Sequence, residues 1–182
     1  MDDPIERIKR HELYRPGKKV RPSTLAAWEQ NHKASLPIEY RRFLLEIGEQ
    51  AYYPFGDLLP LKSWWHHLTG ESSCAASLPW LHEPFALPEK FSTHQEWAAW
   101  SEQWSLLNRK QPWAGTITLT DEGCGMRSLL VLKGPFRGRV CFLDLPKPPW
   151  VFPQGNFLDW FFACLEARRT RSFAGLVPAG LP

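Results

Sequence analysis

Histidine and cysteine side chains are the first candidates for chemistry in this sequence, because both bind metal ions. His66, His67, Cys74 and His82 lie in one stretch of the chain. Their spacing matches no established pattern of zinc ligands, and two adjacent histidines do not point to the same side of a regular helix. We therefore expect no metal site in this stretch.

A reactive thiol is the second candidate, at Cys124 between Gly123 and Gly125. A nucleophilic cysteine needs a nearby base or cation that lowers the pKa of its thiol, whereas the preceding Asp121 and Glu122 would raise it. We interpret Cys124 as a small residue in a glycine turn. The cysteines of the chain form no CxxC pair and are expected to be reduced, mostly buried thiols: Cys74, Cys124, Cys141 and Cys164.

Other catalytic motifs are absent from the sequence. It contains no phosphate-binding loop, no dinucleotide fingerprint, no G-x-S-x-G and no H-E-x-x-H. Its carboxylates are scattered, and no pair is placed for acid–base catalysis. We therefore expect a protein that is not an enzyme, with no catalytic residue and no cofactor.

Recognition of a partner surface remains, and the chain carries 10 tryptophans for it. Trp64 and Trp65 lie in an irregular stretch, and Trp150 follows Lys-Pro-Pro in another. Tryptophans in loops often anchor a protein partner, since they contribute strongly to binding when they are buried at the centre of an interface. The alternative is that they fold back and cap the core, and the sequence leaves both interpretations open.

The charge distribution adds acidic candidates for the same surface. A net charge of +3 is too small to indicate nucleic-acid binding, and no nucleic-acid-binding module is recognisable. Residues 23–132 hold 8 Lys or Arg and 12 Asp or Glu, so the centre of the chain is mildly acidic. This favours a basic partner, although solvated surface charge gives the same pattern. The acidic candidates for partner binding are Glu71, Glu83, Asp121 and Glu122.

Four helices must position these residues. Amphipathic spacing predicts helices over 23–32, 37–48 and 93–107, and a last helix that begins at the N-cap residue Asn156. Thr93 and Glu96 form a capping-box pattern, and the tryptophan stripe of that helix is expected to lie in the core.

Three strands are predicted between the last two helices. Residues 116–120 alternate in polarity, 129–132 are continuously apolar, and 140–145 form the third strand. The segment 134–138 (GPFRG) is a turn pattern that joins the last two strands. The prediction is an α+β fold, in which an antiparallel β-sheet with meander topology packs against N-terminal and C-terminal helices.

One domain is expected, with decorated ends. Residues 1–22 show no clean period and are predicted to be an N-terminal arm; residues 23–170 form the domain, with a Trp- and Pro-rich insertion over about 62–94; residues 171–182 are predicted to be a flexible tail. No apolar run reaches the ~20 residues of a membrane helix. The acidic start does not match a signal peptide, so we expect a cytoplasmic protein.

Six segments, in order, carry a family resemblance: 36–48 (LPIEYRRFLLEIG), 59–61 (LPL), 120–125 (TDEGCG), 129–131 (LLV), 134–140 (GPFRGRV) and 156–161 (NFLDWF). Together they resemble the SUKH superfamily, and within it the Smi/Knr-type domains. Each segment alone is a weak signal, and the agreement of several in order is more specific.

The resemblance implies a function as well as a fold. Bacterial members of this superfamily are non-enzymatic immunity proteins that bind a cognate polymorphic or contact-dependent toxin, often a nuclease, and protect the producing cell. We therefore expect a cognate protein toxin as partner, a monomer, and no direct contact with nucleic acid or membrane. The alternative is a regulatory scaffold or protein-interaction module, as eukaryotic relatives of this fold are.

Overall fold

The computed structural model describes residues 2–53, 56–63, 79–85, 91, 93–106, 114–123, 126–144, 147–152 and 155–171. Its elements are, in chain order, α1 (Pro4–Lys9), α2 (Pro22–His32), α3 (Ile38–Glu46), β1 (Tyr52–Tyr53), β2 (Gly56–Asp57), η1 (Pro79–His82), α5 (His94–Leu106), β3 (Thr116–Gly123), β4 (Met126–Val131), β5 (Val140–Asp144), β6 (Lys147–Val151) and α6 (Phe157–Thr170). The fold is α+β, as predicted.

The main sheet is antiparallel, with the strand order β3-β4-β5-β6. The predicted three-stranded meander is therefore present, and β6 extends it by a fourth strand. Trp150 belongs to this strand and lies opposite Phe142 of β5. The prediction that Trp150 lies in an irregular stretch is wrong, because the Pro-rich sequence of β6 forms the edge of a sheet, where missing N–H donors are tolerated.

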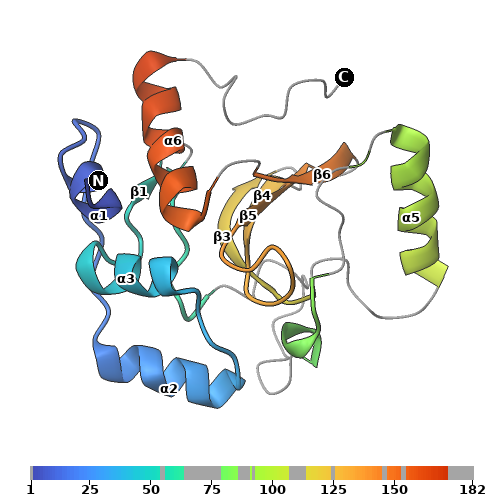
Figure 1. Ribbon diagram of the computed structural model, residues 1–182, viewed down its shortest axis with the longest axis horizontal. Helices are drawn as coiled ribbons and strands as arrows, with labels where there is room; N and C mark the ends of the chain where they lie inside the picture. Colours follow the sequence, from blue (N-terminus) through green and yellow to red (C-terminus); the bar gives the residue numbers. More distant parts are fainter. Residues whose placement is uncertain are drawn as a thin grey trace.

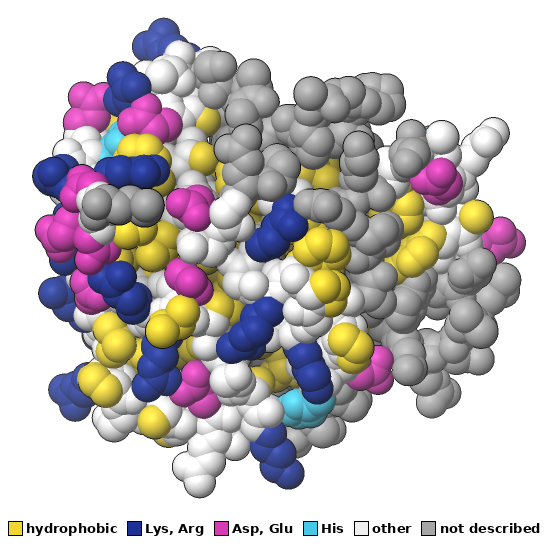
Figure 2. Space-filling view, viewed as in Figure 1, with side chains coloured by type: hydrophobic (Ala, Val, Ile, Leu, Met, Phe, Trp, Pro, Cys, Tyr) yellow, Lys and Arg dark blue, Asp and Glu magenta, His cyan; other side chains and the backbone are white. Residues whose placement is uncertain are grey.

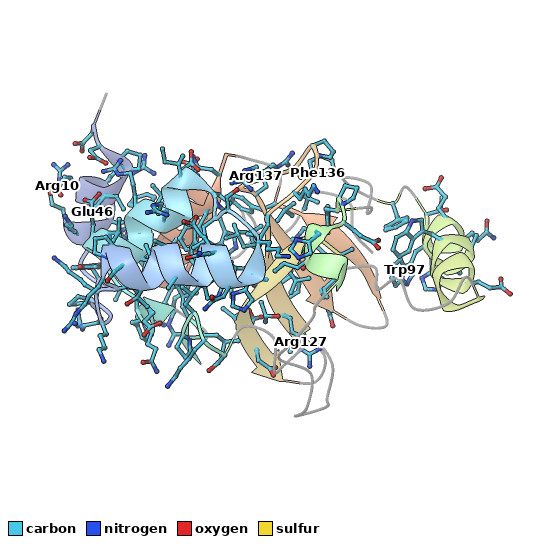
Figure 3. The ribbon with its side chains drawn as sticks, turned by 90° about the horizontal axis from the view of Figure 1, so that it is seen from below. Arg10, Glu46, Trp97, Arg127, Phe136 and Arg137 are labelled. Atoms are coloured by element: carbon cyan, nitrogen blue, oxygen red, sulfur yellow. The ribbon has the colours of Figure 1, made fainter. Side chains whose placement is uncertain are left out.

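Both faces of the sheet are covered (Figure 1). On one face, Ile117, Leu130 and Val140 join the core beneath α3 and α6. On the other face, Leu129 of β4 and neighbouring apolar residues pack with Trp97, which points from α5 toward the sheet (Figure 3). This explains the continuous apolar run of the second predicted strand, since alternate residues of β4 are buried on opposite sides.

Aromatic rings join α3 to α6. The Phe43 ring centroid lies 4.9 Å from that of Phe157 and 4.8 Å from that of Phe161, both in edge-to-face geometry. All three side chains are buried.

Asn156 caps α6 as predicted, and its Oδ1 accepts hydrogen bonds from the backbone N–H groups of Leu158 and Asp159.

The N-terminal segment is part of the core, and the prediction of an arm over residues 1–22 is corrected. The side chains of Ile5 and Ile8 on α1 are fully buried, and they join the same cluster as the rings of α6. Asp3 accepts a hydrogen bond from Arg42 of α3 at 2.9 Å. A helix of six residues has too few turns to give a periodic pattern, so only its docking onto the body reveals it.

Two glycines allow this segment to cross the end of α3. Lys18 and Glu49 exchange backbone hydrogen bonds of 2.9 Å in both directions. A Cβ atom on Gly17 would lie 2.0 Å from the carbonyl oxygen of Glu49, and Gly48 has a φ of +116°. Larger residues at either position would force the two backbones apart.

Candidate functional site

Three of the predicted partner-binding residues, Trp64, Trp65 and Glu71, lie outside the described residues. The same is true of most of the insertion predicted over about 62–94, and of the predicted tail after Arg171.

Trp150 is partly exposed and partly packed on the sheet. Its ring lies 4.6 Å from the ring of Phe142, centroid to centroid, in a tilted arrangement. The neighbouring Val151 is buried in the second core. Trp150 is therefore held by a cross-strand ring contact, and its remaining surface is open to a partner.

Asp121 and Glu122 lie near the end of β3. Asp121 is exposed and lies opposite Arg127 of β4. Glu122 is half-buried, and its Oε1 accepts hydrogen bonds from the hydroxyls of Thr120, at 2.7 Å, and Ser128, at 3.1 Å. Glu122 therefore has a structural role in satisfying two buried hydroxyls, whereas Asp121 presents its carboxylate at the surface.

Glu83 lies at the other end of the same strand. A Cβ atom on Gly115, which precedes β3, would lie 2.4 Å from the Glu83 carbonyl oxygen. Six residues of strand separate Gly115 from Asp121, which corresponds to about 20 Å. The structure therefore does not bring Glu83 together with Asp121 and Glu122.

A basic pocket lies beside η1, near Glu83, and no feature of the sequence predicts it. A cavity of about 370 Å³ opens between the α2–α3 connection, η1 and the β4–β5 turn. Figure 2 shows Lys and Arg side chains and a His side chain gathered over η1 and this turn. The lining residues are Lys33, Ala34, Ser35, Leu81, His82, Leu132, Lys133, Gly134 and Arg137. They come from distant parts of the sequence, so no local motif indicates the pocket.

Arg137 builds one wall of the basic pocket. Its Nη1 donates to the carbonyl oxygens of Ser35, at 3.0 Å, and Leu132, and its Nη2 donates to the Leu36 carbonyl oxygen at 3.1 Å. Lys133 Nζ donates to the carbonyl oxygen of His82 at 2.6 Å. These bonds tie the turn, the α2–α3 connection and η1 together, so the shape of the pocket is fixed by its own cations.

The cations of the basic pocket have no carboxylate partner among the described residues. Lys33, Lys133 and Arg137 form no ion pair there, and Arg137 and Lys133 donate only to oxygens without a net charge. Five other described basic residues do form ion pairs: Lys9, Arg10, Arg41, Arg42 and Arg169. The pocket therefore concentrates uncompensated positive charge around a concave surface.

The two candidate surfaces lie on opposite sides of the molecule. Arg127 lies opposite Asp121 on the neighbouring strand and marks the first surface in Figure 3. Arg137 of the basic pocket and Phe136 are labelled on the other side of the molecule. A single small contact cannot cover both, so a partner that reaches both wraps around the sheet.

The described part of the chain shows no arrangement of side chains for a metal site or a reactive thiol. No three His, Cys, Asp or Glu side chains in those ranges come close enough to share a metal ion. Cys141 and Cys164 form no disulfide bond and are buried, as expected, and burial raises the pKa of the Cys141 thiol, which stays protonated. Cys74 and Cys124 lie outside the described residues. Over the described residues, every helix is too short or too polar to cross a membrane.

Comparisons with protein-family models, with curated proteins and with solved structures found no match to this chain. The resemblance to the SUKH superfamily therefore stays a prediction from the sequence.

Proposed function

We propose that this chain is an immunity protein that binds and neutralises a cognate secreted antibacterial toxin, and that it acts by binding and not by catalysis. The supporting observation is the way in which the resembling segments pack. Segment 36–48 folds as α3, 129–131 lies in β4, 134–140 forms the β4–β5 turn and 156–161 opens α6. Each of these elements contributes buried residues to the main core, and β4 also contributes Leu129 and Val131 to the second core. The segments that carry the resemblance are thus also the segments that build the scaffold.

The scaffold leaves side chains for recognition at its surface. Asp121 presents a carboxylate at one end of β3, and Trp150 presents part of its ring on β6. An exposed acid next to a sheet edge suits the basic surface of a nuclease toxin, and it would speed association with such a surface. Trp150 supplies apolar area that is already fixed in position, so little side-chain entropy is lost on binding.

If a neighbouring gene encodes a toxin, co-expression of the chain with that toxin tests the proposal. We expect that the chain restores growth to cells that express the toxin, and that the two proteins co-purify. Asp121→Lys should slow association about tenfold at low salt, measured by stopped-flow or surface plasmon resonance. Glu12→Lys makes the same charge change at an exposed site on the N-terminal segment and should leave the rate unchanged.

If the toxin still kills cells that contain the correctly folded chain, the proposal is wrong. Growth rescue without a complex would point to the alternative of a regulatory scaffold. An association rate equal in Asp121→Lys and Glu12→Lys would remove Asp121 from the binding surface.

A further inference from the structure

We propose that the basic pocket binds an acidic segment of the protein partner, with a carboxylate side chain among Lys33, His82 and Lys133 and an adjacent apolar side chain on the pocket floor. The inference rests on the proposed function only in naming that partner as a toxin. It assigns a second recognition surface, of opposite charge to the one at Asp121.

The first argument is charge. Lys33 ends α2 as its C-cap with a φ of 48°, which is the left-handed conformation, and its side chain is exposed. Lys133 and His82 are also exposed, and a single hydrogen bond from Lys133 Nζ to a carbonyl oxygen leaves two further N–H donors. An incoming carboxylate therefore meets cations that no described carboxylate neutralises, and it displaces no internal ion pair.

The second argument is the floor of the pocket. Leu81 and Leu132 are 2% and 3% exposed and belong to the main core, and Ala34 lines the same cavity. Leu81 and Leu132 are part of the body of the molecule, so the floor does not need to form on binding. A carboxylate carried on hydrocarbon fills such a site better than an inorganic anion, because the hydrocarbon buries against the floor while the charge stays at the rim.

The third argument distinguishes a protein from a nucleic acid. Carboxylates flank the pocket: Glu83 follows His82 directly, and the Glu39 carboxylate lies 3.8 Å from the position of a Cβ on Gly138. A nucleic-acid backbone needs a longer track of cations than one cavity provides. The apolar floor of Leu81 and Leu132 suits a protein segment, because a peptide carries hydrocarbon side chains beside its carboxylates.

The test uses a defined peptide probe, so it does not depend on the toxin. The probe is the blocked pentapeptide Glu-Leu-Glu-Leu-Glu, and its control is Gln-Leu-Gln-Leu-Gln. We expect amide chemical-shift changes in ¹H–¹⁵N spectra that are confined to residues 33–35, 81–82 and 132–137, with binding at least about tenfold weaker for the control peptide. Added salt should weaken binding of the acidic peptide.

Protein variants assign the effect to the pocket. Lys33→Gln combined with Lys133→Gln should weaken binding of the acidic peptide at least about tenfold, whereas Lys19→Gln, an exposed site outside the pocket, should not. Arg137 is not used, because its bonds to the α2–α3 connection make its replacement a change of structure. Lys133→Gln removes the bond to the His82 carbonyl oxygen, so Lys33→Gln is also measured alone, and this single variant should weaken binding of the acidic peptide without altering that bond. Unchanged thermal unfolding of the Lys→Gln variants verifies that they fold.

Several outcomes overturn the inference, and one separates it from the proposed function. The absence of shifts, equal binding of the two peptides, or shifts outside the pocket excludes recognition of an acidic segment there. Tighter binding of inorganic phosphate or of a six-nucleotide thymidine oligomer at the same residues makes the pocket a phosphate site instead. If the peptide binds as expected but the chain gives no protection from the toxin, the proposed function fails and the pocket stands. If protection and toxin affinity are normal in the double variant, the pocket has no part in toxin binding.

Discussion

Asn156 is the residue on which the start of α6 depends. Its Oδ1 accepts the N–H groups of Leu158 and Asp159, and Asp159 Oδ2 in return accepts the N–H of Asn156 at 3.0 Å. These bonds satisfy donors that have no partner inside the helix. Because α6 carries Phe157 and Phe161 into the main core, the cap also sets where these rings lie.

Replacing this side chain gives a direct measurement of the cap. Asn156→Ala should lower the free energy of unfolding by about 1 kcal/mol, since two backbone donors lose their acceptor. Urea denaturation measures the change. Asn156→Ser keeps an acceptor oxygen at the same position and should lose about half as much or less. Equal losses in the two variants would show that the hydrogen bonds of Asn156 are not what stabilises the helix.

At the scale of elements, α1 is a part of the body that depends on packing alone. Its six residues are too few to form a stable helix in isolation. Ile5 and Ile8 are nevertheless fully buried, and Pro4 and the cap residue Asp3 define where the helix begins. The helix is therefore stabilised by the surface it covers, and it leaves that surface exposed when it detaches.

Truncation of a single α1 side chain tests this placement. Ile8→Ala should lower the free energy of unfolding by about 2–4 kcal/mol, because it leaves a cavity in the main core. Arg10→Ala changes an exposed side chain of the same segment, and its loss should be below about 1 kcal/mol. Chemical denaturation of both variants gives the comparison. If Ile8→Ala is as stable as the wild type, the packing of α1 does not stabilise the core, and the N-terminal segment behaves as an arm.

The sequence predicts elements well where its signal is local. The stripes of α3 and α6, the cap at Asn156 and the β4–β5 turn are confirmed, and Gly138 ends that turn with a positive φ of 86°. The sequence predicts an element poorly where tertiary contacts determine its local structure. The sequence of β6, KPPWV, has the composition of a loop, and only its pairing with β5 makes it a strand. The sequence does not predict the basic pocket, because its cations are adjacent only after folding.

At the scale of the whole molecule, polar side-chain contacts connect the N-terminal segment to α3 and α6. Asp3 bonds to Arg42 of α3, and His11 Nε2 lies 3.1 Å from Glu166 Oε1 of α6. The hydrogen bond from Arg42 lowers the pKa of Asp3, and the hydrogen bond from Arg169 lowers that of Glu166, with a smaller contribution from His11. Both carboxylates are thus more acidic in the folded chain than in the unfolded one.

Stability should therefore fall in acid. The unfolded carboxyls have ordinary pKa values of 3.8 and 4.5, so below about pH 5 the unfolded state binds more protons than the folded state. This contribution is present at higher pH and is lost as the pH falls through the lowered folded values. Urea unfolding at pH 6.5 and pH 3 measures it. Asp3→Asn combined with Glu166→Gln should reduce the difference between the two pH values.

The control for this experiment is Glu102→Gln, an exposed carboxylate on α5, which should keep the wild-type dependence on pH. If the double variant and the control show the same dependence, acid acts through other groups, and these ion pairs contribute nothing measurable.

The edges of the main sheet have a consequence for self-association. Pro148 and Pro149 lie where the register between β6 and β5 is irregular, between the pairs Phe142–Trp150 and Asp144–Lys147, and neither proline has an N–H group to donate to an added strand. At the other edge, β3 has two register irregularities, and the Leu119 carbonyl oxygen already accepts the N–H of Leu59 at 2.7 Å. Neither edge is a regular template for an added strand. Growth of the sheet from copy to copy is therefore disfavoured at both edges, and we expect a protein partner to bind through side chains rather than through a shared sheet.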